Sequence, residues 1–373
     1  MPCRPKLFYL SQNNSSNFNA FNFLTMKLKF ILPALALSFS TVAYAQETTP
    51  APLQISGSVD TYYKYDFNKA SNIKTYFANE HNSISLGMID LALKKTTGKA
   101  SFVGELSFGP RGQSQSIPNA AGLYDETTNS FNIQNLYVSY AFTDKFSMTA
   151  GYMGTFIGYE VISPVANFNY STSYLFGSGP FQNAGIKATY AFSDKVSLMA
   201  GLFNDWNVYQ DFNGVSHVGA QLTVTPVEGW TAYLNALSGR SAGAPGTSTI
   251  FDLTTAYQVT EKFKLGLNAA DHTVSNDNGG YSGVAVYPQF AFTPSAALGL
   301  RAEFFSYKGV GGAASSSVSA FTFSGNFKAG GLTFIPEIRF DSDKDLTQSF
   351  ADKNGIVGSK SASQFSLAAV YAF

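Results

Sequence analysis

The 373-residue chain has little cysteine, little histidine and little charge. Its single cysteine, Cys3, excludes an intramolecular disulfide. The three histidines, His81, His217 and His272, are too few and too scattered to predict a multi-histidine metal site. Charged residues make up 13% of the chain, against about 25% in an average soluble domain. Basic and acidic residues are equal in number, which argues against a nucleic-acid partner. We expect neither a cofactor nor a bound metal.

The sequence also lacks a long apolar run. A helical membrane protein needs about 18 or more consecutive apolar residues, whereas the longest such stretch, residues 30–39, is interrupted by Pro33. What the chain has instead is 34 Phe, 21 Tyr and 33 Gly at a mean hydropathy of −0.01. Abundant aromatics with neutral hydropathy are typical of a transmembrane β-barrel, whose strands face lipid and water alternately.

The amino-terminal region has the features of an export signal. Residues 26–45 begin with a basic segment, continue through about ten apolar residues and end in an A-x-A cleavage site. The residues at the predicted cleavage site are Ala43, Ala45 and Gln46. We therefore expect a cleaved signal peptide over 26–45, with 1–25 an upstream extension that is either not translated or disordered. A short polar lead-in over 46–53 then precedes the barrel at 54–373.

From residue 54 onward, apolar side chains recur at every second position, the period of a half-buried strand. A repeat, Tyr-Ala-Phe-Thr-Asp-Lys at 140–145 and Tyr-Ala-Phe-Ser-Asp-Lys at 190–195, marks a strand end and a tight turn. Seven short turns alternate with eight longer connections, which predicts an all-β, antiparallel, up-and-down barrel of about 16 strands. A secreted β-sandwich would share the alternation of side chains but not the regular alternation of short and long connections.

The phase of each strand, set by its apolar residues, places the strand charges on the opposite, inward face. Facing lipid at mid-bilayer would cost Lys or Arg roughly 2–4 kcal/mol, so we expect no charge on the outward face of a strand core. The candidate pore-lining residues are Asp60, Lys64, Asp90, Glu105, Lys187, Asp252, Lys264, Arg301, Glu303, Lys328, Glu337 and Arg339. With Asp66, the inward set has seven acids and six bases. This near balance predicts no strong preference between anions and cations.

Two stretches carry a resemblance to known proteins. The C-terminal segment, with Phe365, Leu367, Tyr371 and Phe373 on one face, looks like the terminal strand signal of bacterial outer-membrane proteins. That resemblance implies recognition by the barrel-assembly machinery. The stretch from Gly158 through Tyr190, including Gly158-Tyr-Glu-Val-Ile-Ser-Pro164, resembles the OmpL-like putative β-barrel porin family. The resemblance extends over residues 55–373 and implies a porin-type channel in the outer membrane of a Gram-negative bacterium.

A sixteen-strand barrel is wide enough to hold an aqueous lumen. We therefore predict passive diffusion of small hydrophilic solutes and ions, and no enzymatic activity. The connection 157–181 is long and unusually apolar for a loop that faces water. We expect it to fold into the lumen and narrow the pore, with its only charge, Glu160, and nearby Lys187 as an electrostatic filter. The alternatives for this loop are contact with a neighbouring barrel or a cap on the rim.

Three other interpretations stay open. A substrate-specific uptake channel, for example for sugars, would use inward tyrosines, and the pattern places Tyr62, Tyr137, Tyr233 and Tyr287 on that face. A barrel hydrolase would need a nucleophile beside a base, but strand alternation predicts that Ser216 and His217 point in opposite directions. Loops with Asp271, His272 and Asp277, or with three acids over 341–345, could bind a divalent cation. Membrane lipid surrounds such a barrel, and a homotrimer is the usual porin assembly.

Overall fold

The computed structural model describes residues 52–113, 133–208, 211 and 213–373. The predicted extension, the signal peptide with its cleavage site, and residues 46–51 of the lead-in lie outside the described residues. Helices within the described part of the chain are few and short, and none of them could cross a membrane.

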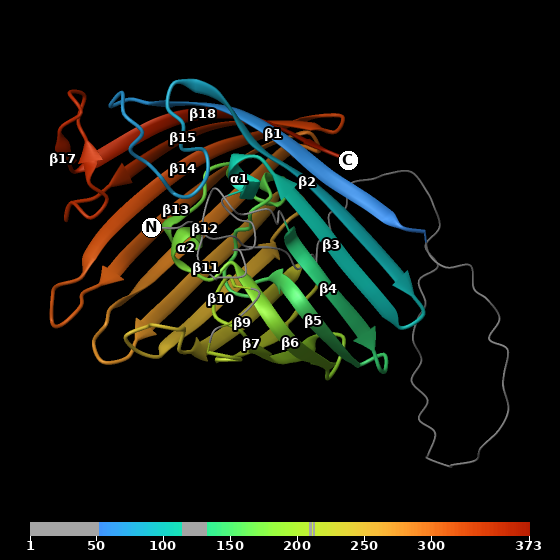
Figure 1. Cartoon of the computed structure of the whole chain (residues 1–373). Coiled ribbons are helices and arrows are strands. Elements are labelled where there is room, and N and C mark those ends of the chain that lie inside the picture. The colour runs from blue at the N-terminus through green and yellow to red at the C-terminus, as the bar shows by residue number, and fades with distance from the viewer. Residues whose placement is uncertain (1–51, 114–132, 209–210, 212) are drawn as a thin grey trace, which may run out of the picture.

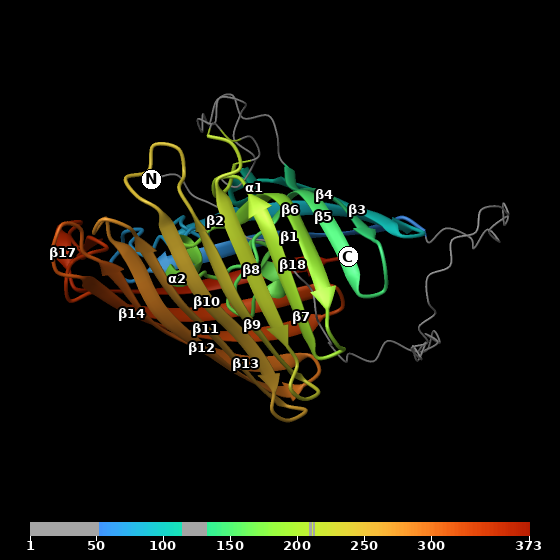
Figure 2. The same cartoon turned by 90° about the horizontal axis from the view of Figure 1, so that it is seen from below.

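Within these residues, sixteen strands form one closed barrel, as the alternation predicts (Figures 1 and 2). Every neighbouring pair is antiparallel, and β1 closes the ring by pairing with β18, for example Val59 with Tyr371. The barrel strands are β1 (Gln54–Asp66), β2 (Ser83–Thr97), β3 (Ala100–Phe108), β4 (Ile133–Ala141), β5 (Phe146–Gly154), β6 (Gln182–Ala191), β7 (Val196–Phe203), β8 (His217–Val224), β9 (Trp230–Gly239), β10 (Ser248–Gln258), β11 (Phe263–Val274), β12 (Gly280–Thr293), β13 (Ala296–Lys308), β14 (Ser316–Ala329), β15 (Leu332–Ser342) and β18 (Ser361–Ala372). A closed barrel excludes the β-sandwich.

The repeated sequence motif is a turn stabilised by a side chain. The Thr143 hydroxyl accepts hydrogen bonds from the backbone N–H groups of Lys145 and Phe146. Ser193 and Thr260 accept the equivalent pairs in two other short turns. A hydroxyl at this position satisfies backbone donors that the strand ladder leaves free, which is why Ser or Thr recurs there.

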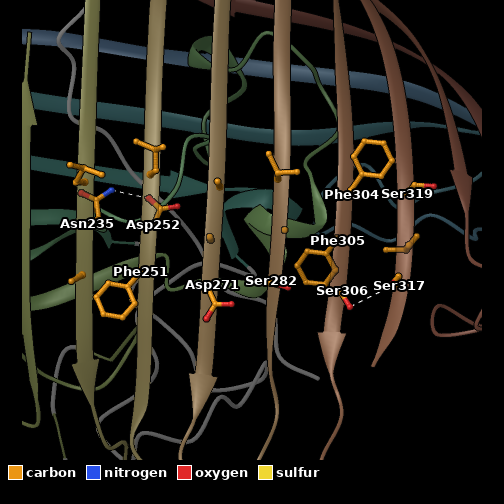
Figure 3. A pocket seen from close by; sticks show the side chains of 18 of the residues that line it. Asn235, Phe251, Asp252, Asp271, Ser282, Phe304, Phe305, Ser306, Ser317 and Ser319 are labelled. Atoms are coloured by element: carbon orange, nitrogen blue, oxygen red, sulfur yellow. Dashed lines mark hydrogen bonds between the residues drawn. The ribbon is translucent and has the colours of Figure 1, made fainter. Parts of the chain in front are cut away.

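Neighbouring residues on one strand show the two faces of the wall. On β13, Phe304 is 55% exposed and faces outward, whereas Phe305 is 2% exposed and faces inward. A hollow of about 1070 Å³ lies against the outer surface of β7–β15 near these residues (Figure 3). Outward-facing Phe251, Leu253 and Phe304 line it. Because the hollow faces away from the lumen, it is not part of the passage.

Five further elements lie in the connections. The helices α1 (Pro110–Gln113) and α2 (Tyr174–Ser178) appear among the barrel strands in Figure 1, and a 3-10 turn spans Pro164–Ala166. The two short strands β16 (Phe350–Ala351) and β17 (Val357–Ser359) form a separate hairpin in the last long connection. We call residues 343–360 the outer hairpin loop.

Candidate functional site: the inward loop

The connection between β5 and β6, residues 155–181, lies inside the barrel; we call it the inward loop. Its first residues contact β8 and β10: Gln221 donates to the Phe156 carbonyl at 3.4 Å, and Gly158 N–H donates to Asp252 at 2.9 Å. Further along, Tyr170 reaches Asp60 of β1 at 2.5 Å. Contacts with strands this far apart around the ring require the loop to cross the lumen.

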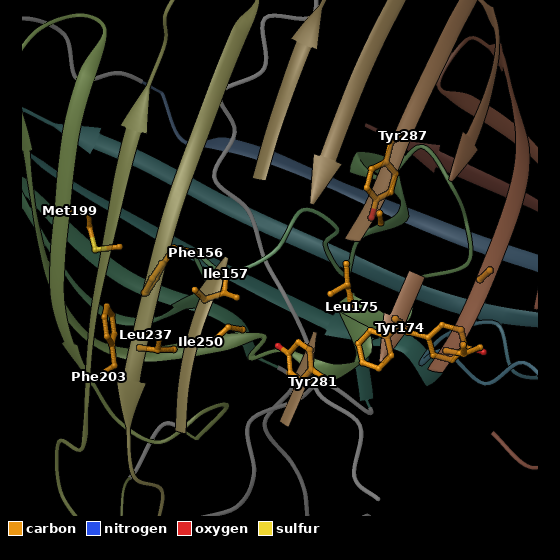
Figure 4. Packing of buried hydrophobic residues seen from close by; sticks show 14 residues of the cluster. Phe156, Ile157, Tyr174, Leu175, Met199, Phe203, Leu237, Ile250, Tyr281 and Tyr287 are labelled. Carbon is orange, nitrogen blue, oxygen red and sulfur yellow. The ribbon is translucent and has the colours of Figure 1, made fainter. Parts of the chain in front are cut away.

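Apolar packing explains why a loop rich in apolar side chains is stable inside the barrel. Phe156, Ile157, Tyr174 and Leu175 of the inward loop form one buried cluster with residues from the strand wall. Figure 4 shows these side chains meeting Met199, Phe203, Leu237, Ile250, Tyr281 and Tyr287. Burying apolar surface stabilises by about 25 cal/mol per Å², so the composition that looks unsuitable for an outside loop suits an inward one.

An ion pair holds the loop against β13. Arg301 Nη1 lies 2.7 Å from Glu160 Oε1, and both side chains are buried. The same guanidinium donates to the Ser171 carbonyl at 2.5 Å and to the Thr322 hydroxyl at 3.1 Å. Glu160 also accepts from Ser173 N–H at 2.7 Å. Arg301 therefore fixes two separate parts of the loop to one strand.

Strand carboxylates satisfy backbone donors of the loop. Glu337 of β15 accepts from Tyr170 N–H at 2.9 Å, and Glu303 of β13 accepts from the N–H groups of Tyr174 and Leu175 at 3.0 and 2.8 Å. Buried backbone groups that lack a partner are costly. These two acids supply the acceptors that the irregular loop cannot supply for itself.

The tip of the loop is clamped from two sides. Burial and the neighbouring Asp60 raise the Tyr170 pKa well above its usual value, so its hydroxyl stays protonated and donates to Asp60. The Arg111 guanidinium lies over the Tyr170 ring, 4.9 Å from its centroid. Arg111 also donates to the Ile162 carbonyl at 2.8 Å. Sequence reasoning placed Tyr170 in the apolar loop but did not predict its contact with Asp60, and it did not single out Arg111, which lies on no barrel strand.

A second buried pair joins the inward loop to the connection 67–82. Arg339 Nε lies 2.7 Å from Asp341 Oδ1 on β15. Arg339 Nη1 donates to Thr75 and to the Thr172 carbonyl, both at 2.8 Å. The prediction that Asp341 lies in a solvated loop is therefore wrong, because it is a buried residue of β15. Asp341 lies two residues after Arg339, and alternate residues of a strand share a face. This spacing was the signal that could have revealed its inward position.

Most strand charges predicted to line the pore face inward but do not meet open water. Ten of the twelve are at most 7% exposed: Asp60, Lys64, Asp90, Glu105, Lys187, Asp252, Arg301, Glu303, Glu337 and Arg339. Lys264 is partly exposed and Lys328 is exposed. Many of the buried groups anchor the inward loop or the connection 67–82, so alternation locates them correctly but does not reveal what covers them.

The expected filter of Glu160 and Lys187 stays a prediction, and the two residues have different surroundings. Glu160 pairs with Arg301 on β13, whereas Lys187 lies on β6, in register with Thr149 of β5. Two of the four inward tyrosines also have a packing role: Tyr287 stacks on Tyr159 of the loop at 4.5 Å, and Tyr62 packs against Tyr170 at 5.6 Å. Tyr137 and Tyr233 are partly exposed.

The prediction that Ser216 and His217 point apart is wrong. Ser216 Oγ lies 2.7 Å from His217 Nδ1 and donates to Asp205 at 2.6 Å. Strand β8 begins at His217, so alternation does not apply to Ser216. In a hydrolytic triad the two imidazole nitrogens contact the serine and the acid separately. Here Nδ1 faces both Ser216 and Asp205, at 2.7 and 3.6 Å.

Of the residues expected in an outside loop near 272, Asp271 and His272 belong to strand β11, whereas Asp277 lies in the loop that follows it. Asp271 faces outward and pairs with Lys308 of β13 at 2.8 Å, with its side chain 57% exposed. His272 faces inward, 2.6 Å from the Ser248 hydroxyl. The outward face thus carries an ion pair at the outer strand ends, beyond the strand cores to which the prediction applied. Within the described residues, no three His, Cys, Asp or Glu side chains are placed to hold a metal ion.

The comparisons with known proteins agree with this architecture. The model of the family described as putative beta-barrel porin-2, OmpL-like, matches residues 52–373. A search of curated proteins finds no match.

Solved structures of similar fold include the outer-membrane channel DcaP of Acinetobacter baumannii, with 13% identity and a TM-score of 0.58 over 88% of this chain and 99% of that one. An anion-selective porin from Comamonas acidovorans gives 13% identity and 0.58 over 86% and 99%. A trimer form of OmpT of Vibrio cholerae gives 12% and 0.56 over 86% and 99%. At these identities the likeness establishes the fold alone.

Proposed function

The chain belongs to the OmpL-like putative β-barrel porin-2 family, and from this premise we propose that its inward loop, residues 155–181, is the constriction of a diffusion channel. The protein is a channel of the bacterial outer membrane. The proposal concerns what limits passage through it: small hydrophilic solutes and ions pass beside the loop, and larger ones are excluded.

The observation that carries the proposal is the set of strand carboxylates that accept hydrogen bonds from the loop backbone. A mobile loop would exchange these contacts for water, whereas Glu303, Glu337 and Asp252 hold backbone donors at 3.4 Å or less. A loop fixed at both ends and along its length presents one shape to a solute. A fixed shape is what a size limit requires.

Planar lipid bilayers test this proposal. Deleting residues 160–178 from the mature chain should raise single-channel conductance roughly twofold or more, because it widens the narrowest section. The matched control deletes residues 352–356, the tip of the outer hairpin loop, which should leave conductance near that of the parent. Equal conductance of the parent and the 160–178 deletion would overturn the constriction.

The geometry at Ser216 favours a channel without hydrolase activity. A nucleophilic serine needs a base that its own acid partner orients, yet Asp205 here accepts from the serine itself. The substrate-specific channel is likewise less well supported, since Tyr62 and Tyr287 pack against the loop. Esterase activity abolished by His217→Ala, or saturable block of conductance by one sugar, would reverse these assignments.

Assembly as a homotrimer and recognition of β18 by the barrel-assembly machinery stay predictions. The trimer form of the OmpT structure supports the first, and conductance steps that arrive in threes would test it. For the second, Phe373 directly follows β18, and its N–H donates to the Gly57 carbonyl at 3.1 Å, next to the seam that closes the barrel. Phe373→Ser should slow insertion into outer-membrane vesicles that contain the machinery more than insertion into pure lipid.

A further inference from the structure

The charges on the inward face of the barrel strands separate by sign. Every acid on that face within the described strands is buried: Asp60, Asp66, Asp90, Glu105, Asp252, Glu303, Glu337 and Asp341. The inward strand charges that keep contact with water are Lys94, Lys264 and Lys328. Counting charges by strand parity alone conceals this separation, because parity says nothing about which side chains the loops cover.

Hydrogen-bond donors surround the buried acids. Asp252 accepts from Asn235 at 2.8 Å and from Asn268 at 2.6 Å, in addition to Gly158 N–H. Glu105 accepts from Asn135 at 2.7 Å, and Asp66 accepts from Asn68 N–H at 2.9 Å. These donors offset part of the negative charge. A solute in the lumen cannot make direct contact with the carboxylates.

The buried bases likewise have hydrogen-bond or ion-pair partners within the protein. Lys64 donates to the Ile73 carbonyl at 2.8 Å, and Arg301 and Arg339 form the ion pairs with Glu160 and Asp341. By contrast, none of the ion pairs among the described residues involves Lys94, Lys264 or Lys328. The charge that a passing solute meets directly on the strands is therefore positive.

The three lysines lie at similar depth, near the short turns. Lys94 is opposite Val103, on the face that also carries Glu105, and lies four residues before Gly98 in the β2–β3 turn. Lys264 is opposite Gln289 and lies two residues after the turn 259–262. Lys328 is opposite Thr333, two residues before Gly330. Short turns face the periplasm in such barrels, so the lysines lie around the inner vestibule.

We propose that Lys94, Lys264 and Lys328 bias the channel toward small anions, with chloride as the simplest example and carboxylate- or phosphate-bearing solutes as the larger ones. The proposal rests on the diffusion function above and adds the charge of the solute. Rings of basic side chains select anions in pores because they lower the energy of the anion along its path. At 0.1 M salt, charges act over roughly 10 Å, so three lysines around the vestibule influence much of its cross-section.

Reversal potentials across a KCl gradient in planar bilayers test the proposal. The variant Lys94→Gln, Lys264→Gln, Lys328→Gln should lower the chloride-to-potassium permeability ratio of the parent by at least about twofold, with a larger shift at 0.1 M than at 1 M KCl because salt screens the charges. The matched control is Lys145→Gln, Lys195→Gln, Lys262→Gln. It removes the same charge from the short turns at the same end of the barrel, and its permeability ratio should equal that of the parent.

The outcomes separate the two proposals. Open channels whose permeability ratio is the same in the parent and in the vestibule variant would overturn the anion bias and leave the diffusion channel standing. An equal shift in the vestibule and turn variants would also overturn it, since net charge rather than the vestibule lysines would then set selectivity. A mature chain that inserts into bilayers without conducting would overturn both. Folding of each variant is checked by heat-modifiable migration on gels.

Discussion

The inward loop and the outer hairpin loop are both long connections with large apolar residues, yet one enters the barrel and the other stays outside. In the inward loop, Tyr170, Tyr174 and Phe176 are at most 5% exposed. In the outer hairpin loop, Ile356 and Val357 are 65% and 64% exposed. Large apolar residues therefore favour a position in the lumen but do not by themselves bring a loop there.

What differs is the set of partners on the barrel strands. Backbone N–H groups of the inward loop meet Glu303, Glu337 and Asp252 from three strands. The outer hairpin loop satisfies its own backbone: Asp352 accepts from Asn354 and Ile356 within the turn. Its attachments to the rest of the molecule include Asn72, whose side chain bonds to both the N–H and the carbonyl of Ala351, and Asn68, which donates to the same carbonyl at 2.9 Å. Ser317 N–H also donates to Asp345 at 2.8 Å. The inward loop is held in the lumen because strand carboxylates lie within hydrogen-bond distance of its backbone N–H groups.

The largest effect should come from breaking the Glu160–Arg301 pair. Arg301→Met leaves Glu160 buried without its cation, a change that costs about 3–5 kcal/mol in comparable sites. The amides of Ser171 and Ser173 should lose hydrogen-exchange protection accordingly, and single-channel current should become noisier. The exposed pair at the outer strand ends provides the comparison: Lys308→Met should cost about 0.2–1 kcal/mol.

The double variant Arg301→Met, Glu160→Gln provides the control. It removes both charges, so the protection lost in Arg301→Met should return in part, since no uncompensated charge remains buried. If Arg301→Met and Lys308→Met lose similar amounts of protection, burial of the ion pair is not what holds the inward loop.

A smaller effect should follow from removing one hydroxyl at the loop tip. Tyr170→Phe removes the donor to Asp60 Oδ2 in a buried site and leaves only Met88 N–H, which donates to Oδ1; this loss costs about 1–3 kcal/mol. Asn72→Ala breaks the partly exposed contact to Ala351 and should cost about 0.5–1.5 kcal/mol. We expect faster exchange at Tyr170 and Ser171 in the first variant and at Ala351 in the second. Slower exchange in either variant, or exchange that changes equally at both loops, would contradict independent anchoring.

The fold could be predicted from the sequence because its determinants are local. Apolar side chains at every second residue define the strand faces, and Thr143, Ser193 and Thr260 mark the short turns. The direction of the inward loop could be inferred from its apolar side chains, because water would not cover them. Its partners could not be predicted, because Glu160 and Arg301 are 141 residues apart and their contact depends on the path of the loop across the lumen. Ser216 shows the limit of the alternation rule, which applies only within a strand. Ser216 precedes β8, so the rule does not predict the direction of its side chain.

The smallest effect concerns pH and should be confined to the outer hairpin loop. Hydrogen bonds from the backbone N–H groups of Ile356 and Asn354 lower the Asp352 pKa below its usual value. A carboxyl whose pKa is depressed by folding stabilises the turn above its unfolded pKa, and this contribution is lost as the pH falls through the folded pKa. The amides of Asn354 and Ile356 should therefore exchange faster than base catalysis alone predicts once the pH falls below about 4. Asp352→Asn, which keeps an acceptor but cannot titrate, should remove this pH dependence. Asp352→Asn should leave exchange in the inward loop unchanged over the same range, because Asp352 accepts its backbone hydrogen bonds from residues of the outer hairpin loop. Simultaneous loosening of both loops at one pH would mean that the hairpin and the inward loop open as a unit, and the contrast between them would fail.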